Sequence, residues 1–271
     1  MQVVAWPLLR KPEPTALAAA RALAHRAVQW PARAAWANLK PLPDDSHTSL
    51  TWDPEMAALL GQPLAGGARV GLRIALHELV FTKGERTEVF LMAGRSEAEA
   101  GAWLDGALAA AGLKQASGTK LPYDMPPALF AKPAQEAANL ATLSVWFAAG
   151  AELLEELRKK YKRHKPGPVR CWPHHFDIAT LLHFDKERSI GIGLSPGDDY
   201  YAQPYFYLSP WPKPDTAKLP ALPPGGRWHT EGFFGAVATA AALLALPEPR
   251  AGLIQVLEAA FEESRRRLGT G

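Results

Sequence analysis

The chain has 271 residues and 48% of them are hydrophobic, so it is long enough to bury a large core and is not expected to be disordered. Thirty Lys and Arg residues against 27 Asp and Glu leave a formal charge of only +3, which argues against a basic surface made for nucleic acid. The single cysteine, Cys171, excludes an intramolecular disulfide and fits a reducing compartment.

The start of the sequence lacks the charged and apolar regions of a secretory signal. The longest apolar run, residues 232–246, is shorter than the roughly 20 residues that a membrane-spanning helix needs. We therefore expect a soluble, cytoplasmic protein with neither a membrane nor nucleic acid as its partner. The composition leaves the oligomeric state open.

The first half of the chain predicts two helices and a hairpin. Residues 15–30 are rich in alanine, with leucines near helical spacing, and Pro31 is expected to end or kink this helix. The alternating run at 69–81 reads as a strand that returns through the turn TKGER as a β-hairpin. Ser96 with Glu99 three residues later forms a capping box, which marks the start of the next helix.

The second half predicts a long helix, a second set of strands and a C-terminal helix. Four prolines forbid regular structure at 121–133, and a wide apolar stripe then predicts a packing helix from about 134 to 161. The segment 228–237 fits either a strand or the start of a helix. Because the helices are not interleaved with the strands, we expect the α+β class, with antiparallel sheets packed against helices. The other predicted elements are strands at 171–184, 189–195 and 204–211, a helix rich in alanine and leucine that ends at Leu246, and a helix at 250–268.

We expect one compact domain spanning residues 1–271, and two similar lobes within it are an open alternative. The lobes would be residues 36–115 and 168–268, bridged by the helix of about 134–161. The short alternating run at 47–52 resembles residues 175–180 over a few positions. Short strands also resemble each other by chance, so the sequence leaves a duplication undecided.

The stretch CWPHHFDIATLLHF, residues 171–184, places two histidines and an aspartate inside an apolar strand pattern. Strand alternation sends His174 to the core face, whereas His175 and Asp177 share the opposite face. An imidazole oriented by a carboxylate is a common general-base pair, and both groups also ligate divalent metals. The alternative is structural, with Asp177 accepting a hydrogen bond from a loop amide or holding His175 in place.

The predicted strand at 189–195 decides whether that face is open. If its isoleucines lie on the core face, then Gly191, Gly193 and Ser195 lie on the face of Asp177, and their missing side chains leave a trough. A one-residue slip of the turn would reverse this arrangement.

The loop SPGDDYY brings Asp198 and Asp199 to the strand end that holds His175 and Asp177, which is enough chemistry for a divalent metal. The metal ligands would be His175, Asp177 and Asp198. Turn chemistry is the alternative, because aspartates in a P-G-D-D sequence satisfy nearby backbone amides.

Aromatic and histidine side chains extend this candidate pocket. Tyr201, Tyr205 and Tyr207 form a dense aromatic patch, either as core packing or as a ligand wall whose hydroxyls orient a polar substrate. His229, in the sequence WHTE, is either a surface residue or a group that reaches the site from the sheet edge. His47 would occupy, in one lobe, the place of His175 in the other, and a plain strand-entry residue is the alternative.

Three motifs, F-D-I-A at 176–179, G-x-x-P-G-D at 193–198 and P-Y-F-Y at 204–207, resemble the second-half signature of a bacterial domain family of unknown function. A less specific likeness covers residues 36–268. The resemblance implies a shared fold and brings no activity with it, but it moves the emphasis from the histidines to Asp177 and the loop after Pro196. The matching residues are Phe176, Asp177, Ala179, Gly193, Pro196, Gly197, Tyr205 and Tyr207.

The sequence thus predicts a polar and aromatic small-molecule pocket at the end of the 171–209 sheet, with Asp177 and His175 as catalytic candidates in hydrolytic or metal-assisted chemistry. A non-catalytic binding or protein-interaction module is the alternative. The sequence contains no P-loop, nucleophile elbow, H-E-x-x-H or C-x-x-C motif, so the reaction and substrate stay open. The ligand-binding candidates are Asp198, Asp199, Tyr201, Tyr205, Tyr207, His229 and His47.

Overall fold

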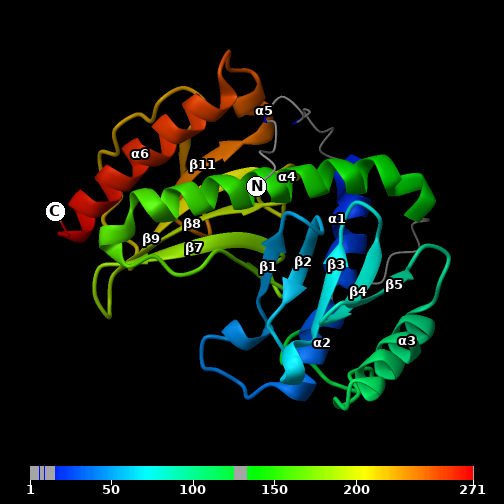
Figure 1. Cartoon of the computed structure of the whole chain (residues 1–271). Coiled ribbons are helices and arrows are strands. Elements are labelled where there is room, and N and C mark those ends of the chain that lie inside the picture. The colour runs from blue at the N-terminus through cyan, green and yellow to red at the C-terminus, as the bar shows by residue number, and fades with distance from the viewer. Residues whose placement is uncertain (1–5, 7–8, 10–15, 125–132, 271) are drawn as a thin grey trace. The chain divides into compact units, whose positions relative to one another are not determined.

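The computed structural model describes residues 6, 9, 16–124 and 133–270, and these group into two compact units (Figure 1). The first unit contains the described part of Ala16–Ala148 together with Arg170–Phe176. The second contains Trp6, Leu9, Ala149–Val169 and the described chain from Asp177 onward. Each unit has antiparallel strands and helices, which confirms the predicted α+β class. The single domain with two similar lobes stays a prediction, and most of the proline-rich segment 121–133 lies outside the described residues.

The strands of the first unit follow the order β6-β1-β2-β3-β4-β5, and each pairs antiparallel with its neighbour. The predicted strand at 69–81 is in fact two strands, because residues 74–77 form a tight turn that ends at His77 with φ 50°. The turn TKGER joins β4 to β5 as predicted. These strands are β1 Leu50–Asp53, β2 Ala58–Gly61, β3 Arg69–Arg73, β4 Glu78–Lys83, β5 Arg86–Leu91 and β6 Arg170–Trp172.

Two helices, α1 (Ala16–Ala27) and α2 (Gln29–Asn38), replace the single helix predicted at 15–30. Pro31 does not end the helical segment, because it lies in the first turn of α2, where a backbone amide has no helical acceptor to lose. Helix α2 then packs on β2 and β3. The break between the two helices at Val28 carries no proline or glycine that could have announced it.

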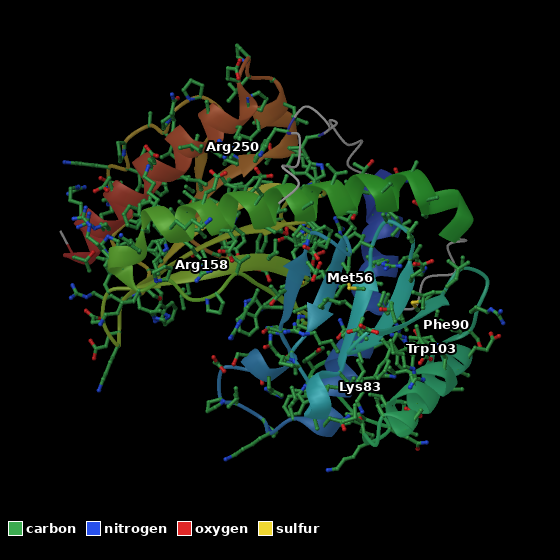
Figure 2. All side chains as sticks on the ribbon, viewed as in Figure 1. Met56, Lys83, Phe90, Trp103, Arg158 and Arg250 are labelled. Carbon is green, nitrogen blue, oxygen red and sulfur yellow. The ribbon has the colours of Figure 1, made fainter. Side chains whose placement is uncertain are left out.

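Helix α3 (Glu97–Ala110) begins with the predicted capping box, in which Ser96 and Glu99 bond each other's backbone amides. Helix α3 contacts the edge of the sheet through two pairs of residues. The ring of Phe90 on β5 stacks on Trp103 with centroids 5.5 Å apart, and the Lys83 ammonium donates to the Ala111 carbonyl at 3.0 Å (Figure 2).

The strands of the second unit follow the order β10-β11-β9-β8-β7, again antiparallel. The undecided segment 228–237 contains no helix: it holds the end of β10, a turn at 230–234 and the start of β11. Helix α6 (Pro249–Leu268) packs on β9 and β11, and α5 (Ala240–Leu244) precedes it. The strands are β7 Asp177–His183, β8 Ser189–Ser195, β9 Tyr205–Trp211, β10 Arg227–His229 and β11 Gly235–Thr239.

The predicted long helix is α4 (Pro133–Lys160), which contributes its residues up to 148 to the first unit and the rest to the second. At Gly150 it approaches β8 so closely that an added Cβ would lie 2.6 Å from Leu194 Cδ2. Farther along the helix, Glu156 forms an ion pair with Arg250 of α6. By length and composition the segment Glu136–Lys160 could cross a membrane, but 56% of its apolar window is buried inside the protein, which is typical of the core helix of a soluble protein.

Candidate functional site

The stretch CWPHHFDIATLLHF is not one strand. It folds as β6, a four-residue turn at 173–176 and β7, and the turn closes when the Phe176 amide donates to the Trp172 carbonyl at 2.6 Å. Phe176 takes φ 58°, a left-handed conformation that is uncommon for a bulky side chain. The predicted alternation of His174 and His175 across a strand is therefore wrong, since both lie in the turn.

Side chains of the first unit hold this turn by the carbonyl of Pro173, and we call His25 and Gln29 the turn anchor. Gln29 Nε2 and His25 Nε2 donate to that oxygen at 2.8 and 2.9 Å. The Tyr123 hydroxyl donates to Gln29 Oε1 at 2.8 Å, and the His25 ring stacks on Phe176 at 5.3 Å. Burial, with smaller contributions from neighbouring cations, lowers the pKa of His25 to about 4, so its imidazole is neutral near pH 7.

The two predicted histidines have different surroundings within the first unit. His174 packs on Tyr123 with ring centroids 5.6 Å apart, and burial lowers its pKa, with His175 adding to the effect. His175 is exposed. Asp177 is the first residue of β7 and belongs to the second unit, so the predicted His175 and Asp177 pair is divided between two units.

Beyond the turn, β7 and β8 pair in the register that places the isoleucines of β8 on the core face, as the predicted trough required. Ile178, Thr180 and Leu182 are buried on the core face and pair with Leu194, Ile192 and Ile190 of β8. The opposite face, which we call the polar face, starts at Asp177 and carries both strand glycines. On this face Ala179 pairs with Gly193, and Leu181 pairs with Gly191.

The trough predicted over these glycines is filled at Gly193 by the ring of Tyr207. A Cβ added to Gly193 would lie 2.5 Å from Cζ of Tyr207, whereas one added to Gly191 would meet no atom closer than 3.8 Å. Lying across the glycine, Tyr207 donates its hydroxyl to Asp177 Oδ2 at 2.5 Å. Burial first, and then the neighbouring Asp177 carboxylate, raises the pKa of Tyr207 well above its ordinary value.

Asp198 organises the loop between β8 and β9 and also holds a tyrosine. Its Oδ1 accepts from the amides of Tyr200 and Tyr201 at 2.9 and 3.0 Å, which is the predicted turn chemistry. Its Oδ2 accepts from the Tyr205 hydroxyl. Burial, followed by this hydrogen bond, raises the pKa of Tyr205. The neighbouring Asp199 is exposed.

Tyr201 and His229 form a third hydrogen-bonded pair, joining Tyr201 Oη to His229 Nδ1 at 2.7 Å. His229 Nε2 lies 2.5 Å from the Glu231 carbonyl, which only accepts, so Nε2 carries the proton and Nδ1 accepts from Tyr201. The Arg227 guanidinium lies over the Tyr201 ring, 4.9 Å from its centroid. We call the residues of these three pairs the tyrosine cluster: Asp177, Asp198, Tyr201, Tyr205, Tyr207 and His229.

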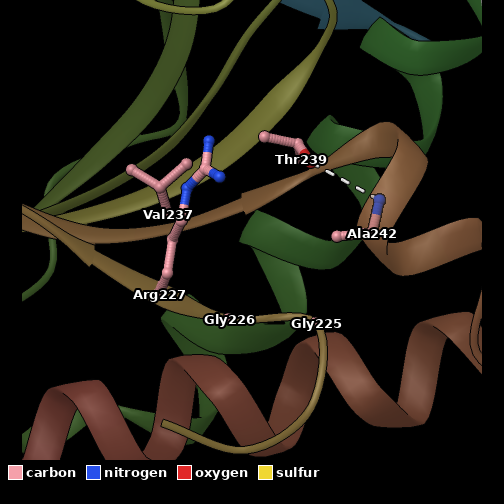
Figure 3. Close-up of a pocket in the computed structure, with 6 residues that line it drawn as sticks. All are labelled: Gly225, Gly226, Arg227, Val237, Thr239 and Ala242. Carbon is pink, nitrogen blue, oxygen red and sulfur yellow. Dashed lines mark hydrogen bonds between the residues drawn. The ribbon is translucent and has the colours of Figure 1, made fainter. Parts of the chain in front are cut away.

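The strand pairing shows that the polar face continues from the tyrosine cluster, across β9 and β11, to a cavity beside β10. Gly193 pairs with Tyr207, Tyr207 with Val237, and Val237 with Arg227, so these side chains share one face. The cavity measures about 160 Å³, and Figure 3 shows the side chains of Arg227, Val237 and Thr239 on the same side of β11. It is lined by Gly225, Gly226, Arg227, Val237, Thr239 and Ala242.

His47 is placed elsewhere, in the first unit. It lies in the 3-10 segment Ser46–Thr48 before β1, so the predicted strand-entry position is wrong. Its Nδ1 accepts from the Leu42 amide at 3.2 Å, and its ring meets Trp36 edge-on at 4.3 Å. Burial lowers its pKa. Across the described ranges 16–124 and 133–270, no three His, Cys, Asp or Glu side chains gather to hold a metal ion.

Six of the site residues predicted from the sequence belong to the tyrosine cluster. Arg227 and the turn anchor were not predicted. Arg227 stands two residues before His229 in the sequence RWH, so strand alternation there would have put both on one face. His25 and Gln29 carried no signal, because a helical histidine and glutamine are usually solvated. No protein-family model matches the chain, and no curated protein or solved structure matches it either.

Proposed function

We propose that the second unit binds a small anion, a carboxylate or a phosphate, in the cavity beside the tyrosine cluster, with Arg227 as the group that recognises it. One observation carries this proposal. Arg227 is the only charged residue among the six described residues that line the cavity, and no carboxylate in the described part of the chain forms an ion pair with it. Arg227 is exposed and its guanidinium lies over the Tyr201 ring, and a planar guanidinium that has no carboxylate partner suits a two-oxygen ligand.

The other lining groups favour the same ligand class. The Thr239 oxygen accepts from the Ala242 amide at 3.4 Å, so its own hydrogen is available to a ligand oxygen (Figure 3). The glycines at 225 and 226 expose backbone rather than side chains. The cavity volume of about 160 Å³ limits the occupant to a small molecule.

The tyrosine cluster supports this role as a positioning device. The Arg227 guanidinium lies over the Tyr201 ring, and the Tyr201 hydroxyl is hydrogen-bonded to His229. Asp177 and Asp198 accept hydrogen bonds from tyrosines, which favours a structural role for both carboxylates over acid and base chemistry on a substrate. We therefore favour non-catalytic binding over the hydrolytic or metal-assisted alternative, and we keep the cytoplasm as the expected location.

Thermal unfolding in inorganic phosphate tests the proposal, with chloride at equal ionic strength as the reference. A ligand at ten times its dissociation constant adds about 1.4 kcal/mol, or an increase of about 2 to 4 °C in Tm, to a domain of this size. We expect that increase in the unaltered protein and none in Arg227→Gln.

Arg163→Gln is the matched control, because Arg163 is an exposed arginine of the same unit that does not line the cavity. It should keep the full response to phosphate. Equal stabilisation of the unaltered protein and Arg227→Gln, or none in either with phosphate and acetate, would overturn the proposal.

A further inference from the structure

The first unit contains a larger cavity, about 470 Å³, which the proposed function does not use. It is an open hollow between the first turns of α2 and of α3, with Ser117 of the segment after α3 also in its lining. The lining residues are Trp30, Arg33, Glu97, Ala98, Gly101, Ala102, Asp105 and Ser117.

Both carboxylates in this lining already have partners. Glu97 receives hydrogen bonds from Arg26 on both of its oxygens, through Nε and, at 2.9 Å, through Nη2. Asp105 accepts from the amides of Ala116 and Ser117 at 2.7 and 3.0 Å and from the Ser117 hydroxyl. Neither carboxylate is therefore a recognition group for a ligand.

Arg33 is in the opposite situation. Its guanidinium carbon lies 4.8 Å from the centroid of the Trp30 ring. Its Nε is buried and has no hydrogen-bond partner within the described residues, where no carboxylate pairs with Arg33 either. Arg33 as a whole is half-buried, so the accessible part of its guanidinium, which has no carboxylate partner among the described residues, can bind an anionic ligand.

The rest of the cavity offers an apolar wall. Ala98 and Ala102 are exposed in this lining, and Trp30, which is 4% exposed, contributes the small part of its ring that the protein leaves uncovered. A Cβ added at Gly101 would lie 3.1 Å from Trp30 Cη2, so the absent side chain lets α3 approach this ring. An aromatic or hydrocarbon body therefore fits here, as in most small-molecule sites.

We propose that the first unit binds a small monocarboxylic acid with an apolar body, its carboxylate on Arg33 and its body against Trp30. The lining holds one cation, Arg33, and two carboxylates, Glu97 and Asp105, and this charge balance disfavours a multiply charged anion such as phosphate. This site is independent of the anion cavity in the second unit.

Calorimetric titration with benzoate tests this proposal, because benzamide has the same ring without the charge. We expect the unaltered protein to bind benzoate at least tenfold more tightly than benzamide, and Arg33→Gln to abolish that difference. Ala98→Leu, at an exposed position of the lining, should weaken both ligands by occupying the cavity. Arg163→Gln should change neither affinity.

Equal affinity for the two probes in the unaltered protein, or a preference for benzoate that survives in Arg33→Gln, would overturn the proposal. If circular dichroism shows that Arg33→Gln is unfolded, Ala98→Leu decides, since unchanged benzoate binding in that variant places the ligand elsewhere. Arg227→Gln should bind benzoate normally and Arg33→Gln should keep its response to phosphate, so the two proposed sites fail separately.

Discussion

Each unit contains a group of hydrogen-bonded polar side chains, the turn anchor in the first and the tyrosine cluster in the second, and the two groups use their side chains in opposite ways. In the turn anchor, the neutral His25 and Gln29 donate to one main-chain oxygen. In the tyrosine cluster, the Asp177 and Asp198 carboxylates accept from tyrosine hydroxyls. The anchor fixes a backbone turn, whereas the cluster fixes rings.

This difference shows that titratable residues close in sequence need not share a site. His175 and Asp177 are two positions apart, yet each belongs to a different unit. The stretch that holds them contains β6 of the first unit and β7 of the second, and the boundary between the units falls between Phe176 and Asp177.

The pH dependence of stability is the strongest test of the anchor. His25 has a folded pKa of about 4 against an ordinary value of 6.5, so the unfolded chain binds the extra proton between those values. The contribution of His25 to the free energy of unfolding is fully present above about pH 6.5. It is lost as the pH falls toward 4, which lowers the free energy of unfolding by about 3 kcal/mol. Urea unfolding of His25→Gln across that range should show the loss reduced by about that amount.

The exposed His183 supplies the control for this measurement. His183→Gln should retain the acid sensitivity of the unaltered protein. If His25→Gln retains it too, the anchor histidine is not held neutral by burial, and the contrast with the tyrosine cluster breaks down.

A matched pair of glycine variants tests the packing of the tyrosine cluster. Gly193→Ala would put a methyl group into the Tyr207 ring, and overpacking of this kind costs about 2 kcal/mol. Gly191→Ala has free space at its Cβ position and should leave the free energy of unfolding nearly unchanged. Equal effects of the two variants in denaturant titrations would show that Tyr207 does not lie across Gly193.

The hydrogen bond between Tyr207 and Asp177 gives the smallest of the three effects. A double-mutant cycle of Tyr207→Phe and Asp177→Ala should yield a coupling energy of about 1.5 kcal/mol, as for a bond to a charged acceptor. The exposed Tyr200 is the reference, and Tyr200→Phe should combine additively with Asp177→Ala. A coupling near zero in the first cycle would place the role of Asp177 elsewhere.

Elements with strong periodicity could be predicted from the sequence. Helix α4, the capping box at Ser96 and strands β8 and β9 lie where apolar spacing and cap residues put them. The hairpin register also followed from alternation, because only one register buries the isoleucines of β8.

Three turns could not be predicted, because their sequences lack the residues that usually mark a left-handed backbone conformation. Tight turns at 54–57, 74–77 and 173–176 end at Ala57, His77 and Phe176, each with φ between 48° and 58°. Glycine or asparagine normally announces that conformation, and none is present. Alternation through the third turn places His174 and His175 on opposite faces of a strand, and that placement is wrong because both residues lie in the turn.

The contact of Tyr207 with Gly193 has a consequence for related sequences. The ring occupies the volume that a side chain at position 193 would need, so the two positions are coupled in what they accept. In an alignment of relatives we expect glycine at 193 wherever 207 is aromatic, and a larger residue at 193 only where 207 has become small. Paired replacement of this kind would show that the contact between the ring at 207 and the strand at 193 is kept in related proteins.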